Sequence, residues 1–157
     1  MLIKYIAGGY IFDKQKTPYL TEAKELTLAQ SQYELVAYGV FVGTMYSIIG
    51  LAAALNLLQD ATLIHSIWLF VSVGVICSIF NVIRKYDIIS SYIISIAPAI
   101  VVSFCLYEAF IANASFVSLT ILLCLFLLSL KYGWRVTKIV AWQRYTGEFK
   151  TNNYKKV

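Results

Sequence analysis

Long apolar stretches alternate with short polar ones along most of this chain. Four stretches contain almost no charge, at residues 35–58, 63–83, 88–111 and 114–130. A helix needs about 20 apolar residues to cross the hydrocarbon core of a bilayer, which is about 30 Å thick. Helices also satisfy their own backbone hydrogen bonds in lipid, whereas the strands of a membrane barrel are about 10 residues long and alternate in polarity. The pattern therefore predicts four transmembrane helices.

Short polar connections separate these stretches, at residues 59–62, 84–87 and 112–113. Loops of this length force consecutive helices to lie beside one another in opposite directions. We therefore expect an all-α integral membrane protein, built as a four-helix transmembrane bundle with up-down-up-down topology.

The composition agrees with this prediction. Hydrophobic residues make up 60% of the chain and charged residues 13%, whereas soluble domains contain about 45–50% apolar and about 25% charged residues. This difference excludes an ordinary water-soluble domain. It also excludes a disordered chain, because disordered segments are poor in apolar residues.

The positive charges lie on one side of the predicted membrane. All 13 Lys and Arg residues precede the first stretch, lie in the connection 84–87 or follow the fourth stretch: Lys4, Lys14, Lys16, Lys24, Arg84, Lys85, Lys131, Arg135, Lys138, Arg144, Lys150, Lys155 and Lys156. Such placement follows the positive-inside rule, so the net charge of +5 does not indicate a nucleic-acid partner. We expect both termini in the cytoplasm and a multi-pass location in the bacterial inner (plasma) membrane.

The chain divides into three segments. Residues 1–33 are expected to form a cytoplasmic N-terminal segment with a short helix over 18–31, because Thr17 and Pro18 resemble an N-cap followed by proline. Residues 34–130 contain the bundle, and residues 131–157 are expected to form a basic amphipathic stem and a cytoplasmic tail. Cations and tryptophans of the stem are expected at the lipid headgroups: Lys131, Trp134, Arg135, Lys138 and Trp142. They form either a positive-inside tail without lipid specificity, which is the favoured alternative, or a dedicated lipid-recognition site.

Small side chains recur along two of the stretches. Helices in lipid approach closely where side chains are small, and the spacing of Gly39 and Gly43 matches the GxxxG contact motif. Packing faces are expected at Gly39, Gly43, Ser47 and Gly50 in the first stretch and at Ser91, Ser95, Ala99 and Ser103 in the third. These faces pack either within the bundle or against neighbouring subunits.

Pro98 lies in the middle of the third stretch. It has no amide hydrogen to donate to the carbonyl of Ile94, so we expect a bend in the helix. Ser95 or a neighbouring helix is expected to compensate for the lost hydrogen bond.

Ionisable side chains at membrane depth are expensive and are therefore candidates for function. Glu108 lies near the outer end of the third stretch, and with Asp60 and His65 it would form an ion or proton site at the outer surface. The alternative is that Glu108 and His65 are interfacial side chains in contact with water. Glu34 has the same two alternatives at the cytoplasmic start of the first stretch.

The sequence offers little for catalysis or metal binding. One histidine and three cysteines at different depths provide neither bis-histidine haem ligation nor a zinc site. We expect Cys77, Cys105 and Cys124 to be buried thiols. No catalytic motif is recognisable, so we expect no enzymatic activity, no cofactor and no metal.

Two functional hypotheses remain. The first is an accessory, assembly or scaffold subunit of a larger membrane complex, which acts by packing its helices against other integral membrane subunits. The alternative is a small homo-oligomeric transporter or channel, with the acidic residues and His65 at its outer mouth. Membrane lipid is an expected partner in both cases, and nucleic acid in neither.

Overall fold

The structure, a computed structural model, describes residues 21–59 and 62–146, and every regular element within those ranges is a helix. Helix α2 spans Leu28–Gln59, α3 spans Leu63–Lys85, α4 spans Ile88–Ile111 and α5 spans Phe116–Thr146. All four are long and apolar enough to cross a membrane. The prediction of an all-helical chain with four helices of membrane-spanning length is confirmed.

Helix α2 begins earlier than its apolar pattern indicated. Residues 21–27 form bends and turns, so the helix expected over 18–31 is wrong for the described part that precedes Leu28. The hydroxyl of Thr27 accepts a hydrogen bond from the Gln30 amide at 3.3 Å, and the Gln30 side-chain oxygen accepts one from the Thr27 amide at 3.0 Å. This reciprocal pair is a capping box, which fixes the first turn of the helix.

Helix α5 is unbroken over 31 residues. The apolar stretch up to Leu130 and the basic stretch after it therefore belong to a single helix. At 1.5 Å per residue this helix is about 46 Å long, which exceeds the hydrocarbon core of about 30 Å. Its C-terminal turns therefore extend beyond the apolar layer of any bilayer that it crosses steeply.

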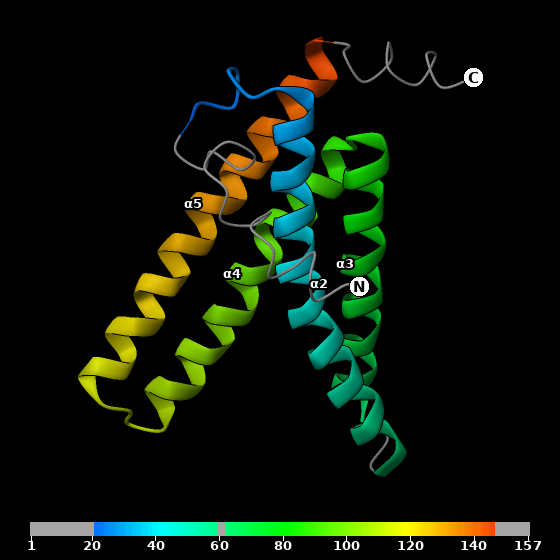
Figure 1. Cartoon of the computed structure of the whole chain (residues 1–157). Coiled ribbons are helices and arrows are strands. Elements are labelled where there is room, and N and C mark those ends of the chain that lie inside the picture. Colours follow the sequence, from blue (N-terminus) through cyan, green and yellow to red (C-terminus); the bar gives the residue numbers. More distant parts are fainter. Residues whose placement is uncertain (1–20, 60–61, 147–157) are drawn as a thin grey trace, which may run out of the picture.

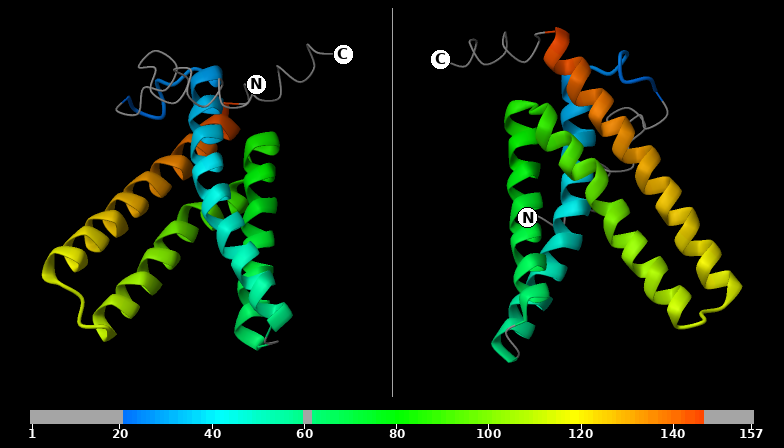
Figure 2. Two further views of the ribbon diagram at one scale, coloured as in Figure 1. Left: turned by 60° about the horizontal axis from the view of Figure 1, so that its bottom comes forward. Right: turned by 180° about the vertical axis from the view of Figure 1, so that it is seen from behind.

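The helices are arranged as two pairs. Helix α2 packs along α3, and α4 packs along α5. The pairs meet where α2 begins, where α3 is joined to α4 and where α5 ends, and they diverge towards the opposite ends of the helices (Figures 1 and 2). Contacts between α3 and α4, and fewer from α2 to α4 and α5, connect the pairs.

The buried core lies where the two pairs meet. All four helices contribute to it, together with Leu26 and Tyr86 beside them: Leu26, Leu35, Tyr38, Val42, Tyr46, Val75, Ile79, Val82, Tyr86, Ile94, Ala97, Val136, Ile139 and Val140. At the diverging ends, by contrast, Leu58 is 84% exposed and Phe116 is 85% exposed. The four helices thus diverge at one end and are not packed together along their full length. Lipid tails are as apolar as leucine, so apolar side chains alone do not hold helices together in a membrane.

Two tyrosines of α2 bind α4 beside its proline. Pro98 leaves the carbonyl of Ile94 without its usual helical donor, and the Tyr38 hydroxyl donates to that oxygen at 3.1 Å. Tyr46 donates to the carbonyl of Ala97 at 2.9 Å. A neighbouring helix therefore supplies the compensating hydrogen bond, which is one of the two alternatives expected, and at the same time it connects the two helix pairs.

Candidate functional site

A buried ion pair connects α2 to α5. The side chain of Glu34 is fully buried, whereas that of Arg135 is 18% exposed. The Nε atom of Arg135 donates to one carboxylate oxygen of Glu34, and Nη2 donates to the other at 3.1 Å. Tyr132 donates to the carboxylate at 3.2 Å, and Nη1 of Arg135 donates to the carbonyl of Thr21 at 2.6 Å. The cluster joins α5 to α2 and to the segment that precedes it.

This geometry decides between the two alternatives for Glu34. It is not a headgroup-level side chain in contact with water, because it has no exposed surface. The guanidinium of Arg135, which was expected at the lipid headgroups, pairs with Glu34 in the structure. The two residues are 101 positions apart in the sequence, so no helical periodicity could pair them. Their opposite charges at the same predicted membrane boundary were the signal that could have done so.

A second buried polar cluster holds α4 against α5. The Ser95 hydroxyl lies 2.7 Å from the Gly133 carbonyl oxygen, 2.6 Å from the Ser91 carbonyl oxygen and 2.9 Å from the Thr137 hydroxyl. A Cβ atom at Gly133 would lie 2.4 Å from the backbone oxygen of Ser95. Gly133 therefore permits the two backbones to approach closely. This role was not predicted, because the surrounding residues 131–142 have the pattern of a basic amphipathic stem.

The predicted small-residue faces divide into covered and uncovered positions. On α2, a Cβ atom at Gly39 would lie 2.8 Å from the Ile79 side chain, and one at Gly50 would lie 3.0 Å from Ser72. These two glycines therefore pack against α3. On α4, Ser91, Ser95 and Ala99 are buried, whereas Ser103 is exposed, as is Ser47 on α2.

The uncovered part of the α2 face lines a groove. The groove has a volume of about 550 Å³ and runs between α2 and α3 on their exposed side. Gly43, Thr44 and Ser47 contribute small side chains from α2, while apolar residues such as Ile76 and Phe80 line it from α3. A Cβ atom at Gly43 would only touch Ile79, at 3.5 Å, so close helix packing within the chain does not require glycine there.

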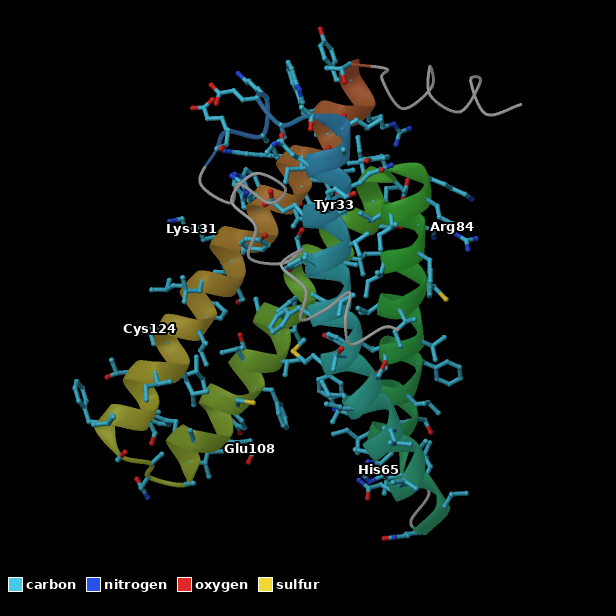
Figure 3. The ribbon with its side chains drawn as sticks, viewed as in Figure 1. Tyr33, His65, Arg84, Glu108, Cys124 and Lys131 are labelled. Carbon is cyan, nitrogen blue, oxygen red and sulfur yellow. The ribbon has the colours of Figure 1, made fainter. Side chains whose placement is uncertain are left out.

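The predicted outer ionisable site does not form a cluster in the described residues. His65 lies on α3 and Glu108 on α4, in helix pairs that diverge at this end (Figure 3). Glu108 is exposed and His65 is half-buried. Asp60 lies outside the described residues. The geometry therefore offers no joint site for His65 and Glu108.

The opposite end of the molecule is basic. Lys131, Trp134 and Lys138 are exposed along α5, whereas Trp142 is half-buried and stacks on Tyr145 with ring centroids 6.2 Å apart.

The α3–α4 junction contributes to the same end. Arg144 Nη1 lies 3.9 Å from Asp87 Oδ1, and the Asp87 carboxylate accepts a hydrogen bond from the Ser90 amide at 2.8 Å as the N-cap of α4. Hydrogen bonds from Ser90 hold the pKa of the Asp87 carboxyl below its usual value, and the charges of Arg144 and Lys85 lower this pKa further.

The cysteines are exposed on the helix surfaces rather than buried, which corrects the expectation for Cys77, Cys105 and Cys124. Within residues 21–59 and 62–146, no group of three or more His, Cys, Asp or Glu side chains is placed to hold a metal ion.

Comparison of the chain with protein-family models, with curated proteins and with solved structures finds no match.

Proposed function

We propose that this chain is a multi-pass protein of the bacterial plasma membrane, with its helices crossing up, down, up and down and both termini in the cytoplasm. The cations of the described residues support this orientation, because they precede α2, end α3 or lie in the second half of α5: Lys24, Arg84, Lys85, Lys131, Arg135, Lys138 and Arg144. The beginning of α2 and the ends of α3 and α5 lie at the same end of the molecule (Figure 1). The connections at the other end, 59–62 and 112–115, contain no Lys or Arg. Cytoplasmic loops carry the excess of basic residues in such membranes.

Within that membrane we propose a non-enzymatic role as an accessory, assembly or scaffold subunit of a larger complex. The observation that carries this proposal is the division of the α2 small-residue face. Gly39 and Gly50 are buried against α3, with Gly39 also at the edge of the groove, while Gly43 is half-buried and Thr44 and Ser47 are exposed in the groove. Small residues let a neighbouring backbone approach closely, and van der Waals packing and hydrogen bonds then drive helix association in lipid. The groove therefore suits a transmembrane helix of another subunit.

The competing hypothesis is a homo-oligomeric transporter or channel with Glu108, Asp60 and His65 at its mouth. A coupling site requires ionisable groups that converge at one depth. Because His65 and Glu108 belong to diverging helix pairs, helix docking is the better supported of the two functions.

A pair of matched substitutions tests the docking role. Gly43→Leu places a side chain in the groove, while Gly74→Leu makes the same change on α3 at a position where a Cβ atom meets nothing within 4 Å. Each variant, carrying an affinity tag, is extracted from native membranes in a mild detergent. The size of its assembly is measured by native electrophoresis, and the partners that it retains by mass spectrometry.

We expect wild type and Gly74→Leu to migrate with the same partner subunits, and Gly43→Leu to lose them at an equal level of membrane insertion. Retention of the complete complex by Gly43→Leu would contradict docking through the groove. Assembly of the wild type with further copies of itself alone, without other subunits, would favour the transporter hypothesis instead.

A further inference from the structure

One face of the C-terminal part of α5 combines lysines with exposed aromatic rings. Lys131, Trp134, Lys138 and Tyr145 fall within about 60° of one another on a helix of 3.6 residues per turn, and we call them the basic-aromatic face. Trp134 is 60% exposed and Tyr145 is 85% exposed. Both lysines are exposed as well, and Lys131 points away from the other helices (Figure 3).

The rotation of α5 about its axis is fixed by the opposite face. Gly133, Val136, Thr137 and Val140 are buried against the other helices. Arg135 points sideways to Glu34 and is therefore withdrawn from the exposed side. The cations that remain beside Trp134 are thus Lys131 and Lys138, one turn before it and one turn after it.

The position of this face along α5 places it at the level of lipid headgroups. The exposed face of the preceding turns is apolar, with Leu123 51% exposed and Leu127 57% exposed. It becomes basic at Lys131, one turn later. From Lys131 to Lys138 the helix axis advances about 10 Å, compared with about 5–8 Å for the polar layer on each side of the hydrocarbon core. Tryptophan is enriched at this boundary because its ring is apolar and its N–H is polar.

We propose that the basic-aromatic face binds the headgroup of an anionic phospholipid, with Lys131 and Lys138 donating hydrogen bonds to its phosphate and Trp134 packing between the two lysines at headgroup level. Two ammonium groups on one exposed face complement a negative headgroup, and within residues 21–59 and 62–146 neither forms an ion pair with a carboxylate. The inference rests on the proposed membrane orientation, but it does not depend on partner docking in the α2–α3 groove, which lies on the other helix pair.

The test uses Trp134 itself as the probe. The variant Trp68→Phe/Trp142→Phe leaves Trp134 as the single tryptophan of the chain. Trp68 contacts Phe104 edge-on at 5.9 Å, and phenylalanine preserves an aromatic ring there. The protein is reconstituted in equal mixtures of phosphatidylcholine and phosphatidylglycerol, in which one lipid or the other carries bromine. Bromine quenches only a tryptophan that lies next to it.

We expect brominated phosphatidylglycerol to quench Trp134 more strongly than brominated phosphatidylcholine. Each lysine near an anionic surface contributes about a fivefold factor to association. The preference is therefore expected to fall by at least about fivefold in Lys131→Gln/Lys138→Gln. The control Arg84→Gln/Lys85→Gln removes the same net charge from the end of α3 and is expected to retain the preference.

Equal quenching by the two lipids, or no quenching by either, would overturn the proposal. An equal loss of preference in both double variants would also overturn it, because the effect would then reflect overall charge. Retention of the preference in free inorganic phosphate at matched ionic strength supports lipid as the source of the bound phosphate, and its loss counts against it. If these tests fail but the protein resists alkaline extraction from membranes, only the lipid-binding inference is overturned. If the protein is extracted at alkaline pH, its proposed insertion across the membrane is overturned as well.

Discussion

Replacing Glu34 by Gln removes the carboxylate that pairs with the Arg135 guanidinium while nearly preserving the volume of the side chain. Because Glu34 is fully buried and Arg135 is 18% exposed, the substitution leaves a largely buried charge without its counterion. Removing one partner of a buried pair typically destabilises a protein by about 3–5 kcal/mol. We expect a value near the lower limit, about 3 kcal/mol, because Arg135 retains some contact with solvent and its bond to the Thr21 carbonyl.

The assay is reversible unfolding in mixed micelles with increasing denaturing detergent, followed by far-ultraviolet circular dichroism. The double variant Glu34→Gln/Arg135→Gln has no unpaired charge, so it is expected to recover most of the loss. The control Glu108→Gln changes an exposed carboxylate and is expected to alter the free energy of unfolding by less than about 0.5 kcal/mol. A loss below about 1 kcal/mol in Glu34→Gln, or a double variant as unstable as the sum of its single changes, would show that the buried ion pair does not stabilise the fold.

Three further predictions concern the contacts that hold the helix pairs. Gly133→Ala places a Cβ atom 2.4 Å from the Ser95 carbonyl oxygen and is expected to lower the free energy of unfolding by about 1–3 kcal/mol in the same assay, with no loss contradicting close packing. Tyr38→Phe leaves the buried Ile94 carbonyl without its donor and is expected to destabilise by about 1–3 kcal/mol, whereas unchanged stability would exclude the compensating bond. Asp87 has a lowered pKa in the fold, so its contribution to stability is complete above its ordinary pKa of 3.8 and is lost as pH falls below that value. Asp87→Asn is therefore expected to flatten the dependence of the melting temperature on pH in that acidic range, and an unchanged slope would count against the assignment.

Hydrophobic patterning was sufficient to predict the helices but not how they associate. The apolar stretches 63–83 and 88–111 correspond closely to α3 and α4. A helix of membrane-spanning length requires apolar side chains along its whole length, so its ends coincide with the ends of the apolar stretch. The beginning of α2 was misplaced because the capping box of Thr27 and Gln30 precedes the apolar run. Caps depend on short polar side chains, which hydropathy does not detect.

The contacts between helix pairs depend on residues far apart in the chain. Tyr38 and Ile94, for example, are separated by 56 positions, and Glu34 and Arg135 by 101. A helical wheel orders residues within one helix and contains no information on the rotation or the partner of the next. For the same reason the sequence alone could not show which small residues of α2 are buried against α3 and which are exposed in the groove.

The orientation of the helices in the membrane is tested most directly by labelling single cysteines. The three native cysteines are replaced by Ser, and Ala112→Cys or Tyr145→Cys is introduced at the opposite ends of α4 and α5. Right-side-out membrane vesicles are then treated with an impermeant maleimide before and after permeabilisation. We expect labelling of Ala112→Cys in intact vesicles and of Tyr145→Cys only in permeabilised ones. The reverse pattern, or labelling of both positions in intact vesicles, would contradict a basic end that faces the cytoplasm.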